Sequence, residues 1–201
     1  MPRRHLVALA LAAGAIVAAL LLDRWAFASM VSPTIYDKDL GRLLRVAGFV
    51  PTWILGGLAL ALHDRTLVPP VPWRGWQRGA AVMLAPVATG LAAEVLKLLF
   101  RRERPLDHAG AYVFRAWGDR PFSTAGLGMP SSHTLVAFGA AAALAALFPR
   151  TRWVWYALAA GCGVSRVLAQ AHFLSDVTVA AVVGVVLGTW LTRRLAPAYA
   201  S

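Results

Sequence analysis

Hydrophobic residues in this chain gather into six long runs that are separated by short polar segments. The runs cover residues 6–22, 46–62, 79–100, 130–148, 153–169 and 177–191. About 20 predominantly apolar residues form a helix long enough to cross the hydrocarbon core of a bilayer. The pattern therefore predicts an all-α fold, a bundle of six transmembrane helices.

Several of these runs approach that length only when polar residues at one end are counted. The residues concerned are Glu94, Lys97, Ser131, Ser132, His133, Arg166 and Asp176. A charge at the centre of a bilayer costs roughly 3 kcal/mol on insertion scales, so charged residues in such runs are functional candidates. We expect them near one membrane face, turned toward the interior of the bundle.

The first run has a second interpretation, as a secretory signal peptide. The Ala-Phe-Ala sequence at 26–28 resembles a small-residue cleavage site. However, the run is longer than a usual signal core, and Asp23 and Arg24 lie between it and that site. We therefore expect a retained span.

The connection between the third and fourth runs, residues 101–129, is too polar and too rich in glycine and proline to be a span. Its aromatic residues, Tyr112, Phe114 and Trp117, favour contact with the membrane surface. We expect an interfacial loop or short helix here, and we expect residues 1–201 to form a single domain.

Composition supports a membrane protein. Hydrophobic residues make up 59% of the chain and charged residues 14%, against about 25% charged residues in ordinary soluble domains. The net charge is +11, and 18 of the 20 basic residues are arginine. Because they flank apolar runs instead of lining one polar face, they favour binding to anionic lipid headgroups, and no nucleic acid is expected.

An even number of spans would place both termini on one side of the membrane. Nine of the 20 basic residues would then lie on the same side of the membrane as the termini. On the opposite side, eight basic residues remain once those of the candidate site described below are left out. This balance favours cytoplasmic termini. We expect a bacterial inner-membrane protein with its active site on the outer face.

The first of three polar motifs is Lys97-Leu-Leu-Phe-Arg-Arg-Glu-Arg104-Pro105. Residues seven apart share a helix face, so Lys97 and Arg104 are expected to point the same way, with Arg101 between them, before Pro105 ends the helix. Such cations suit an anion, although cationic anchors at a helix end are the alternative. Glu94 is expected to pair with Lys97.

The second motif, Pro130-Ser131-Ser132-His133, opens the fourth run. The first turn of a helix has unpaired backbone N–H groups and a partial positive charge, which together attract anions. The serines add donors and His133 adds a titratable proton. A helix cap beside an incidental histidine is the alternative.

The third motif is Ser165-Arg166, five residues, His172, three residues and Asp176. On a helix, His172 and Asp176 would meet, and a carboxylate on one imidazole nitrogen makes the other a better nucleophile. Arg166 offers a planar fork of donors that matches phosphate oxygens. Three ionisable groups in an apolar stretch favour a functional site over an ordinary hydrogen-bonded pair.

Together the three motifs resemble the signature of the type 2 phosphatidic acid phosphatase superfamily. Their order and spacings fit, and the resemblance covers residues 97–191. One departure is Ser132, because the second motif usually has glycine there. Glycine would allow close backbone approach to the phosphate, but Ser132 still supplies its N–H if helical, so we expect a tuned site and not an inactive one.

The resemblance implies a membrane phosphatase that works through a phosphohistidine. His172 would attack phosphorus with Asp176 orienting it, and His133 would protonate the leaving group and then activate water. The residues that would hold the phosphate oxygens are Lys97, Arg104, Ser131, Ser132 and Arg166. No metal or other cofactor is implied. The expected partner is a phosphorylated lipid, such as undecaprenyl diphosphate, phosphatidylglycerol phosphate, phosphatidate or lipid A.

Two other functions stay open at this stage. Vanadium-dependent haloperoxidases share this site, but they are soluble, and the apolar runs argue against them. A membrane anion channel or transporter would use the cations, but it would gain nothing from the spacing of His172 and Asp176. The sequence does not indicate an oligomeric state.

Overall fold

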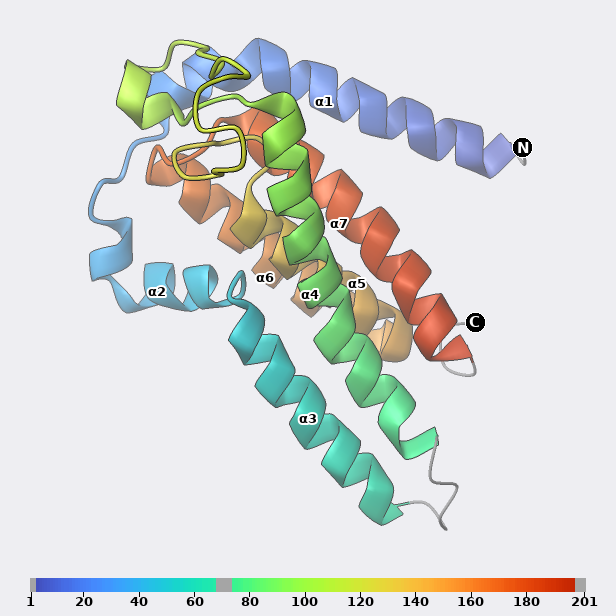
Figure 1. Cartoon of the computed structure of the whole chain (residues 1–201). Helices are drawn as coiled ribbons and strands as arrows, with labels where there is room; N and C mark the ends of the chain where they lie inside the picture. The colour runs from blue at the N-terminus through green and yellow to red at the C-terminus, as the bar shows by residue number, and fades with distance from the viewer. Residues whose placement is uncertain (1–2, 68–73, 198–201) are drawn as a thin grey trace.

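The computed structural model describes residues 3–67 and 74–197, and these form helices and loops without a β-strand (Figure 1). Seven α-helices follow one another: α1 (Arg3–Ser29), α2 (Asp39–Val46), α3 (Val50–Leu67), α4 (Arg74–Phe100), α5 (Ser132–Leu147), α6 (Arg152–Leu168) and α7 (Leu174–Leu195). Three short 3-10 helices lie between them: η1 (Ile35–Asp37), η2 (Pro105–His108) and η3 (Pro149–Thr151). The predicted all-α class is confirmed.

The number of membrane-crossing helices differs from the prediction. Among the described residues, three helices are long and apolar enough to cross a membrane: His5–Ser29, Trp76–Phe100 and Leu174–Leu195. The pair α2 and α3, bent by 68°, adds a fourth if it counts as one span. Helices α5 and α6 have only 16 and 17 residues, which is shorter than a usual span even with the motif residues Ser132, His133, Ser165 and Arg166 inside them. Length and composition thus support three or four spans of the six.

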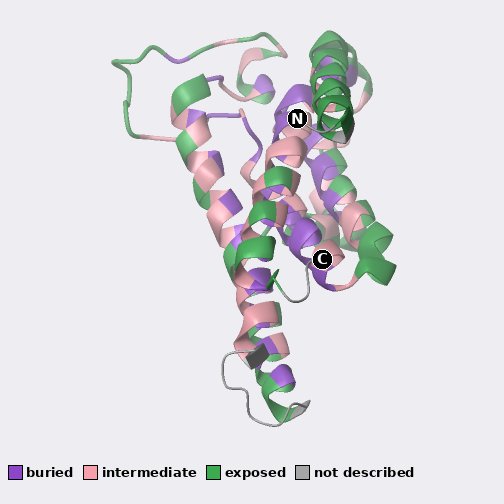
Figure 2. Cartoon of the chain, turned by 90° about the vertical axis from the view of Figure 1, so that its right-hand side faces the viewer, coloured by how far each residue is buried: buried purple, intermediate pink, exposed green. Residues whose placement is uncertain are grey.

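Helix α5 occupies the centre of the bundle. Eleven of its sixteen residues are buried, as expected for a helix that is apolar on every side. It packs against α4, α6 and α7, and Figure 2 shows the buried residues on the inward faces of these helices. Small residues allow such close approach: a Cβ on Gly188 would lie 2.7 Å from the carbonyl oxygen of Gly139.

Helix α1 is exposed along most of its length (Figure 2). Its buried side chains, Ala19, Asp23 and Ala26, all lie toward its C-terminal end, and the helix diverges from α7 toward the N-terminus (Figure 1). The exposed residues include many leucines. A surface of this kind suits hydrocarbon, so the chain is a membrane protein.

The loop after α4 is folded by two buried arginines. Arg101 has a φ of 55° and donates to the carbonyl oxygens of Arg115 (3.0 Å) and Ala116 (2.6 Å). Arg115 donates to Glu103 at 2.9 Å. The left-handed backbone at Arg101 ends α4 at Phe100. The predicted continuation of the helix to Pro105 is therefore wrong, and Lys97 and Arg104 do not share a helix face.

A Gly184→Ala substitution is expected to lower thermal stability. The added Cβ would lie 2.8 Å from the Cβ of Phe138 and 2.9 Å from the carbonyl oxygen of Leu135, and overpacking a core costs about 1–3 kcal/mol. The melting temperature of the purified protein in detergent should fall by several degrees. Gly56→Ala is the matched control, because a Cβ there meets nothing within 4 Å. Equal melting temperatures for the two variants would contradict the packing.

Candidate active site

His172 lies in the connection between α6 and α7 and is buried. Its Nδ1 is 2.8 Å from the carbonyl oxygen of Gly128 and 3.7 Å from Oδ2 of Asp176. Because a carbonyl can only accept, Nδ1 carries the hydrogen and Nε2 keeps its lone pair. The sequence suggested that Asp176 would select this tautomer, whereas in the structure the hydrogen-bond acceptor is Gly128, which comes from the loop after α4.

The protonation state of His172 follows from its surroundings. Burial lowers the pKa of the imidazole below its ordinary value, and the positive charges of Arg166 and Arg104 act in the same direction. Asp176 opposes them but does not outweigh them. The ring is therefore neutral at pH 7, which leaves Nε2 available as a nucleophile.

Asp176, on the first turn of α7, is fully buried. Its Oδ2 accepts the backbone N–H of Phe173 at 2.8 Å. Its Oδ1 accepts two hydrogen bonds from the guanidinium of Arg102, one from Nε at 3.2 Å and one from Nη2. This carboxylate is thus held rigidly beside His172.

Arg102 also connects Asp176 to α1. Its Nη1 is 3.8 Å from Oδ2 of Asp23, and its Nη2 donates to the hydroxyl of Ser175 at 2.6 Å. Asp23 accepts from the backbone N–H of Ser175 at 2.8 Å and from the hydroxyl of Tyr112 at 2.7 Å. Burial, together with Asp23, raises the pKa of Tyr112 to about 12, so the phenol stays protonated.

Sequence reasoning missed Arg102, Asp23 and Tyr112 as parts of the site. One signal was present: Asp23 stands at the end of an apolar run, and a carboxylate buried in such surroundings requires a cationic partner. Nothing in the sequence indicated which arginine would provide it.

Each of the two predicted phosphate-binding arginines has a buried N–H donor that finds no acceptor in the described part of the chain. Among the described residues, the buried Nε atoms of Arg104 and Arg166 have no hydrogen-bond partner. Arg166 is held by its Nη1, which donates to the hydroxyl of Tyr36 at 3.0 Å, and that hydroxyl donates to the carbonyl oxygen of Ser165 at 3.1 Å. An unsatisfied buried donor costs about 1–3 kcal/mol, so a bound anion would stabilise both arginines.

Lys97 and Ser132 meet at Glu94. Oε1 of Glu94 lies 3.0 Å from Nζ of Lys97, which confirms the predicted pair, and it accepts the hydroxyl of Ser132 at 2.7 Å. The serine that replaces the usual glycine therefore bonds to α4 through its side chain. Ser131 occupies the N-cap position of α5 without a capping hydrogen bond from its side chain; it is fully buried, and its hydroxyl accepts from Thr134 at 3.0 Å.

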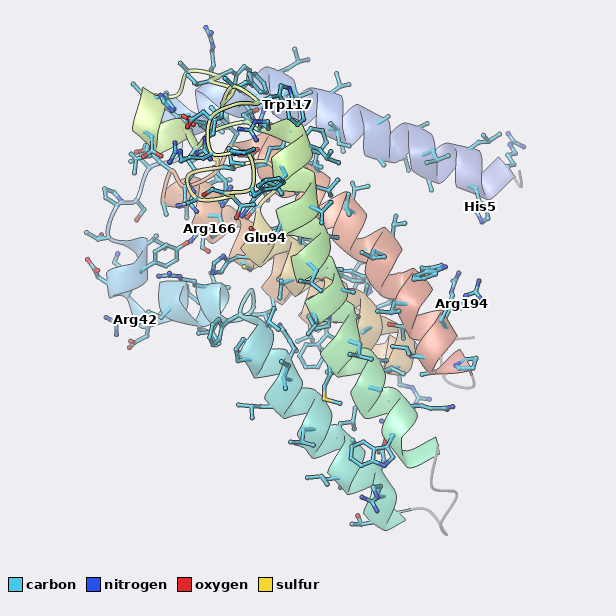
Figure 3. All side chains as sticks on the ribbon, in the orientation of Figure 1. His5, Arg42, Glu94, Trp117, Arg166 and Arg194 are labelled. Carbon is cyan, nitrogen blue, oxygen red and sulfur yellow. The ribbon has the colours of Figure 1, made fainter. Side chains whose placement is uncertain are left out.

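His133, on the first turn of α5, lies within electrostatic range of His172, Arg166 and Lys97. The three motifs thus converge at one end of the bundle, where Figure 3 shows Glu94, Arg166 and Trp117, while Arg194 lies toward the other end. Among the described residues, no group of three or more His, Cys, Asp and Glu side chains is placed to hold a metal ion.

Two cavities share His133 and Phe49. The first, of about 700 Å³, is lined by Tyr36, Arg42, Arg45, Val46, Phe49 and His133. The second, of about 370 Å³, lies between α3 and α4 and is lined almost wholly by apolar atoms, from residues that include Val50, Val87 and Leu91. The candidate general acid therefore lies where a basic cavity meets an apolar one.

Comparison with known proteins identifies the family. The sequence model of the PAP2 superfamily matches residues 78–198, and the chain belongs to this superfamily. It is similar to two curated proteins named lipid A 1-phosphatase, from Rhizobium johnstonii and Rhizobium etli. Each is 36% identical over 124 residues, which are 61% of this chain and 48% and 50% of those proteins. The chain spans about half the length of these relatives. No solved structure gave a significant match.

An Arg102→Met substitution is expected to destabilise the protein strongly. It leaves Asp176 and Asp23 buried without their cation, and removing one partner of a buried ion pair costs about 3–5 kcal/mol. The melting temperature in detergent should drop well below that of the wild type. Arg24→Gln, one position from Asp23 but exposed, controls for the loss of a charge on this end of the bundle. A melting temperature of Arg102→Met equal to that of the control would show that the ion pair does not stabilise the fold.

Proposed function

We propose that this chain is a membrane lipid phosphatase that hydrolyses a phosphomonoester or diphosphate of a lipid through a phosphohistidine at His172. The observation that carries the proposal is the pair of arginines, Arg104 and Arg166, whose buried Nε atoms have no partner among the described residues. Both lie within electrostatic range of a neutral, buried imidazole. Unpaired cationic donors can bind the oxygens of a phosphate, and a nucleophile beside them can attack its phosphorus, so the arrangement suits phosphoryl transfer.

In the first step, Nε2 of His172 attacks phosphorus and the bond to the leaving oxygen breaks. His133 donates a proton to that oxygen. The phosphorylated ring becomes positively charged, and the carbonyl of Gly128 and the carboxylate of Asp176, at 2.8 and 3.7 Å from Nδ1, would stabilise it. In the second step, His133 takes a proton from water, the water oxygen bonds to phosphorus, and the P–N bond breaks.

The equatorial phosphate oxygens need positive partners in both steps. Arg104 and Arg166 would supply their free Nε donors, and Lys97 would supply an ammonium group held at 3.0 Å from Glu94. The backbone N–H groups at the start of α5, at Ser132 and beyond, would complete the cradle after the Ser131 cap. No step requires a group other than these residues and water.

The apolar cavity between α3 and α4 supports a lipid substrate. It shares His133 with the reacting centre, and residues such as Val87 and Leu91 line it. A hydrocarbon chain in this cavity would reach the site sideways from the bilayer. The names of the two Rhizobium relatives make a phosphate of lipid A one candidate, beside undecaprenyl diphosphate, phosphatidylglycerol phosphate and phosphatidate.

Phosphate release from these four lipids, measured in detergent with a chelator present, tests the proposal. His172→Ala should reduce release by at least about 10³-fold, while Arg24→Gln should leave it unchanged. Rapid quenching of the wild type with labelled substrate should trap an acid-labile, alkali-stable phosphoenzyme that His172→Ala lacks. Full activity of His172→Ala would contradict the phosphohistidine mechanism.

The orientation proposed for the bundle has six spans, cytoplasmic termini in the inner membrane and the site on the outer face. Cys162, the single cysteine, is fully buried, so new cysteines can be read against a low background. In cells with a permeabilised outer membrane, an impermeant maleimide should label Phe122→Cys, where the native side chain is 91% exposed. It should label Arg150→Cys only after lysis. The reverse pattern would invert the orientation, and labelling of both would show that α5 does not cross the membrane.

A further inference from the structure

The basic cavity beside His133 contains a cation that the proposed mechanism does not use. Of its two arginines, Arg42 is engaged, because it donates to the carbonyl oxygens of Tyr36 (3.0 Å) and Asp37 (2.9 Å). Arg45 differs: among the residues that the structure describes, its guanidinium has no hydrogen-bond or ion-pair partner. This exposed side chain lies over the ring of Tyr36, within electrostatic range of His133.

The ring of Tyr36 places Arg45 close to the proposed phosphate site. The guanidinium carbon of Arg45 lies 5.1 Å from the ring centroid, and that of Arg166 lies 5.6 Å from the same centroid. The two cations are therefore at most about 11 Å apart. Figure 3 shows Arg42 and Arg166 at the same end of the molecule, on α2 and α6. Two like charges near one ring repel each other, and an anion between them would stabilise both.

The cavities indicate which part of a substrate this anion belongs to. His133, the proposed donor to the leaving oxygen, lines the cavity that contains Arg45. A leaving group that His133 protonates can therefore lie in that cavity, within reach of Arg45. His133 and Phe49 also line the apolar cavity, so a hydrocarbon tail can continue from there between α3 and α4.

We propose that Arg45, supported by Tyr36, forms a second anion subsite that binds a phosphate of the leaving group. This inference rests on the proposed function. The substrate class is then a lipid diphosphate, because its leaving group carries a phosphate directly beside the phosphate bound at Arg166, and Arg166 and Arg45 contact the same Tyr36 ring. The bond from the terminal phosphorus to the bridging oxygen breaks, the terminal phosphate passes to His172, and the lipid monophosphate leaves with that oxygen, protonated by His133.

Farnesyl diphosphate and farnesyl monophosphate test the subsite, because they differ only in the second phosphate. With both lipids in non-ionic detergent, Arg45→Gln should lower kcat/KM for the diphosphate by about tenfold or more, since a charged hydrogen bond is lost. It should leave kcat/KM for the monophosphate within about twofold, which also shows that the variant is folded. Arg24→Gln, exposed at the same end of the bundle and outside this cavity, should change neither.

The other outcomes overturn the subsite. Equal losses on both lipids would mean that Arg45 supports the main phosphate site, and no loss on either would mean that it binds nothing. If Arg45→Gln lowers kcat/KM for the monophosphate only when phosphatidylglycerol is added, Arg45 binds the headgroup of a separate lipid. If the wild type prefers the monophosphate, the proposed subsite is wrong, but the proposed lipid phosphatase function still holds. A wild type that releases phosphate from no lipid would remove the proposed function itself.

Discussion

The buried guanidinium of Arg102 is the interaction on which the arrangement of this site depends. It lies between Asp23 of α1 and Asp176 of α7, and all three side chains are 3% exposed or less. Without this cation, two buried carboxylates would lie in an apolar bundle with no positive charge to compensate them, which is strongly unfavourable. Because Asp176 also accepts the N–H of Phe173, this one cation fixes the start of α7, the position of α1 and the backbone that presents His172.

The remainder of the site has the opposite property, since its cations outnumber the groups that could satisfy them. Arg104 and Arg166 each have a buried Nε donor without a partner among the described residues, while Arg45, which shares the Tyr36 ring with Arg166, is exposed. The unpaired buried donors of Arg104 and Arg166 are unfavourable in the empty protein. They become favourable only when an anion enters, so the electrostatic strain of the free site and the affinity proposed for phosphate have the same origin.

The loop after α4 orients the nucleophile instead of merely connecting two helices. Arg101 and Arg115 fold it by donating to its own carbonyl oxygens. Burial alone would raise the pKa of Glu103, but its hydrogen bonds to Arg115 and His108 hold that pKa below its ordinary value, so the carboxylate stays charged inside the loop. The folded loop then presents the carbonyl of Gly128 to His172.

The sequence by itself determined the all-α class, the helix positions and the pair of Glu94 and Lys97, because these depend on local hydrophobicity and on residues three apart. It also brought out the three motifs, whose members the structure gathers at one end of the bundle. It predicted six spans where, over the residues described, three or four pass by length and composition. It also failed at Arg101, where one left-handed residue ended α4 and removed the shared face of Lys97 and Arg104. Only the tertiary structure decided that Arg102 binds Asp23 and Asp176, that Gly128 bonds to His172, and that Tyr36 holds Arg166. Those partners are 44 to 130 residues apart in the chain, and no local pattern encodes which buried donor will meet which acceptor.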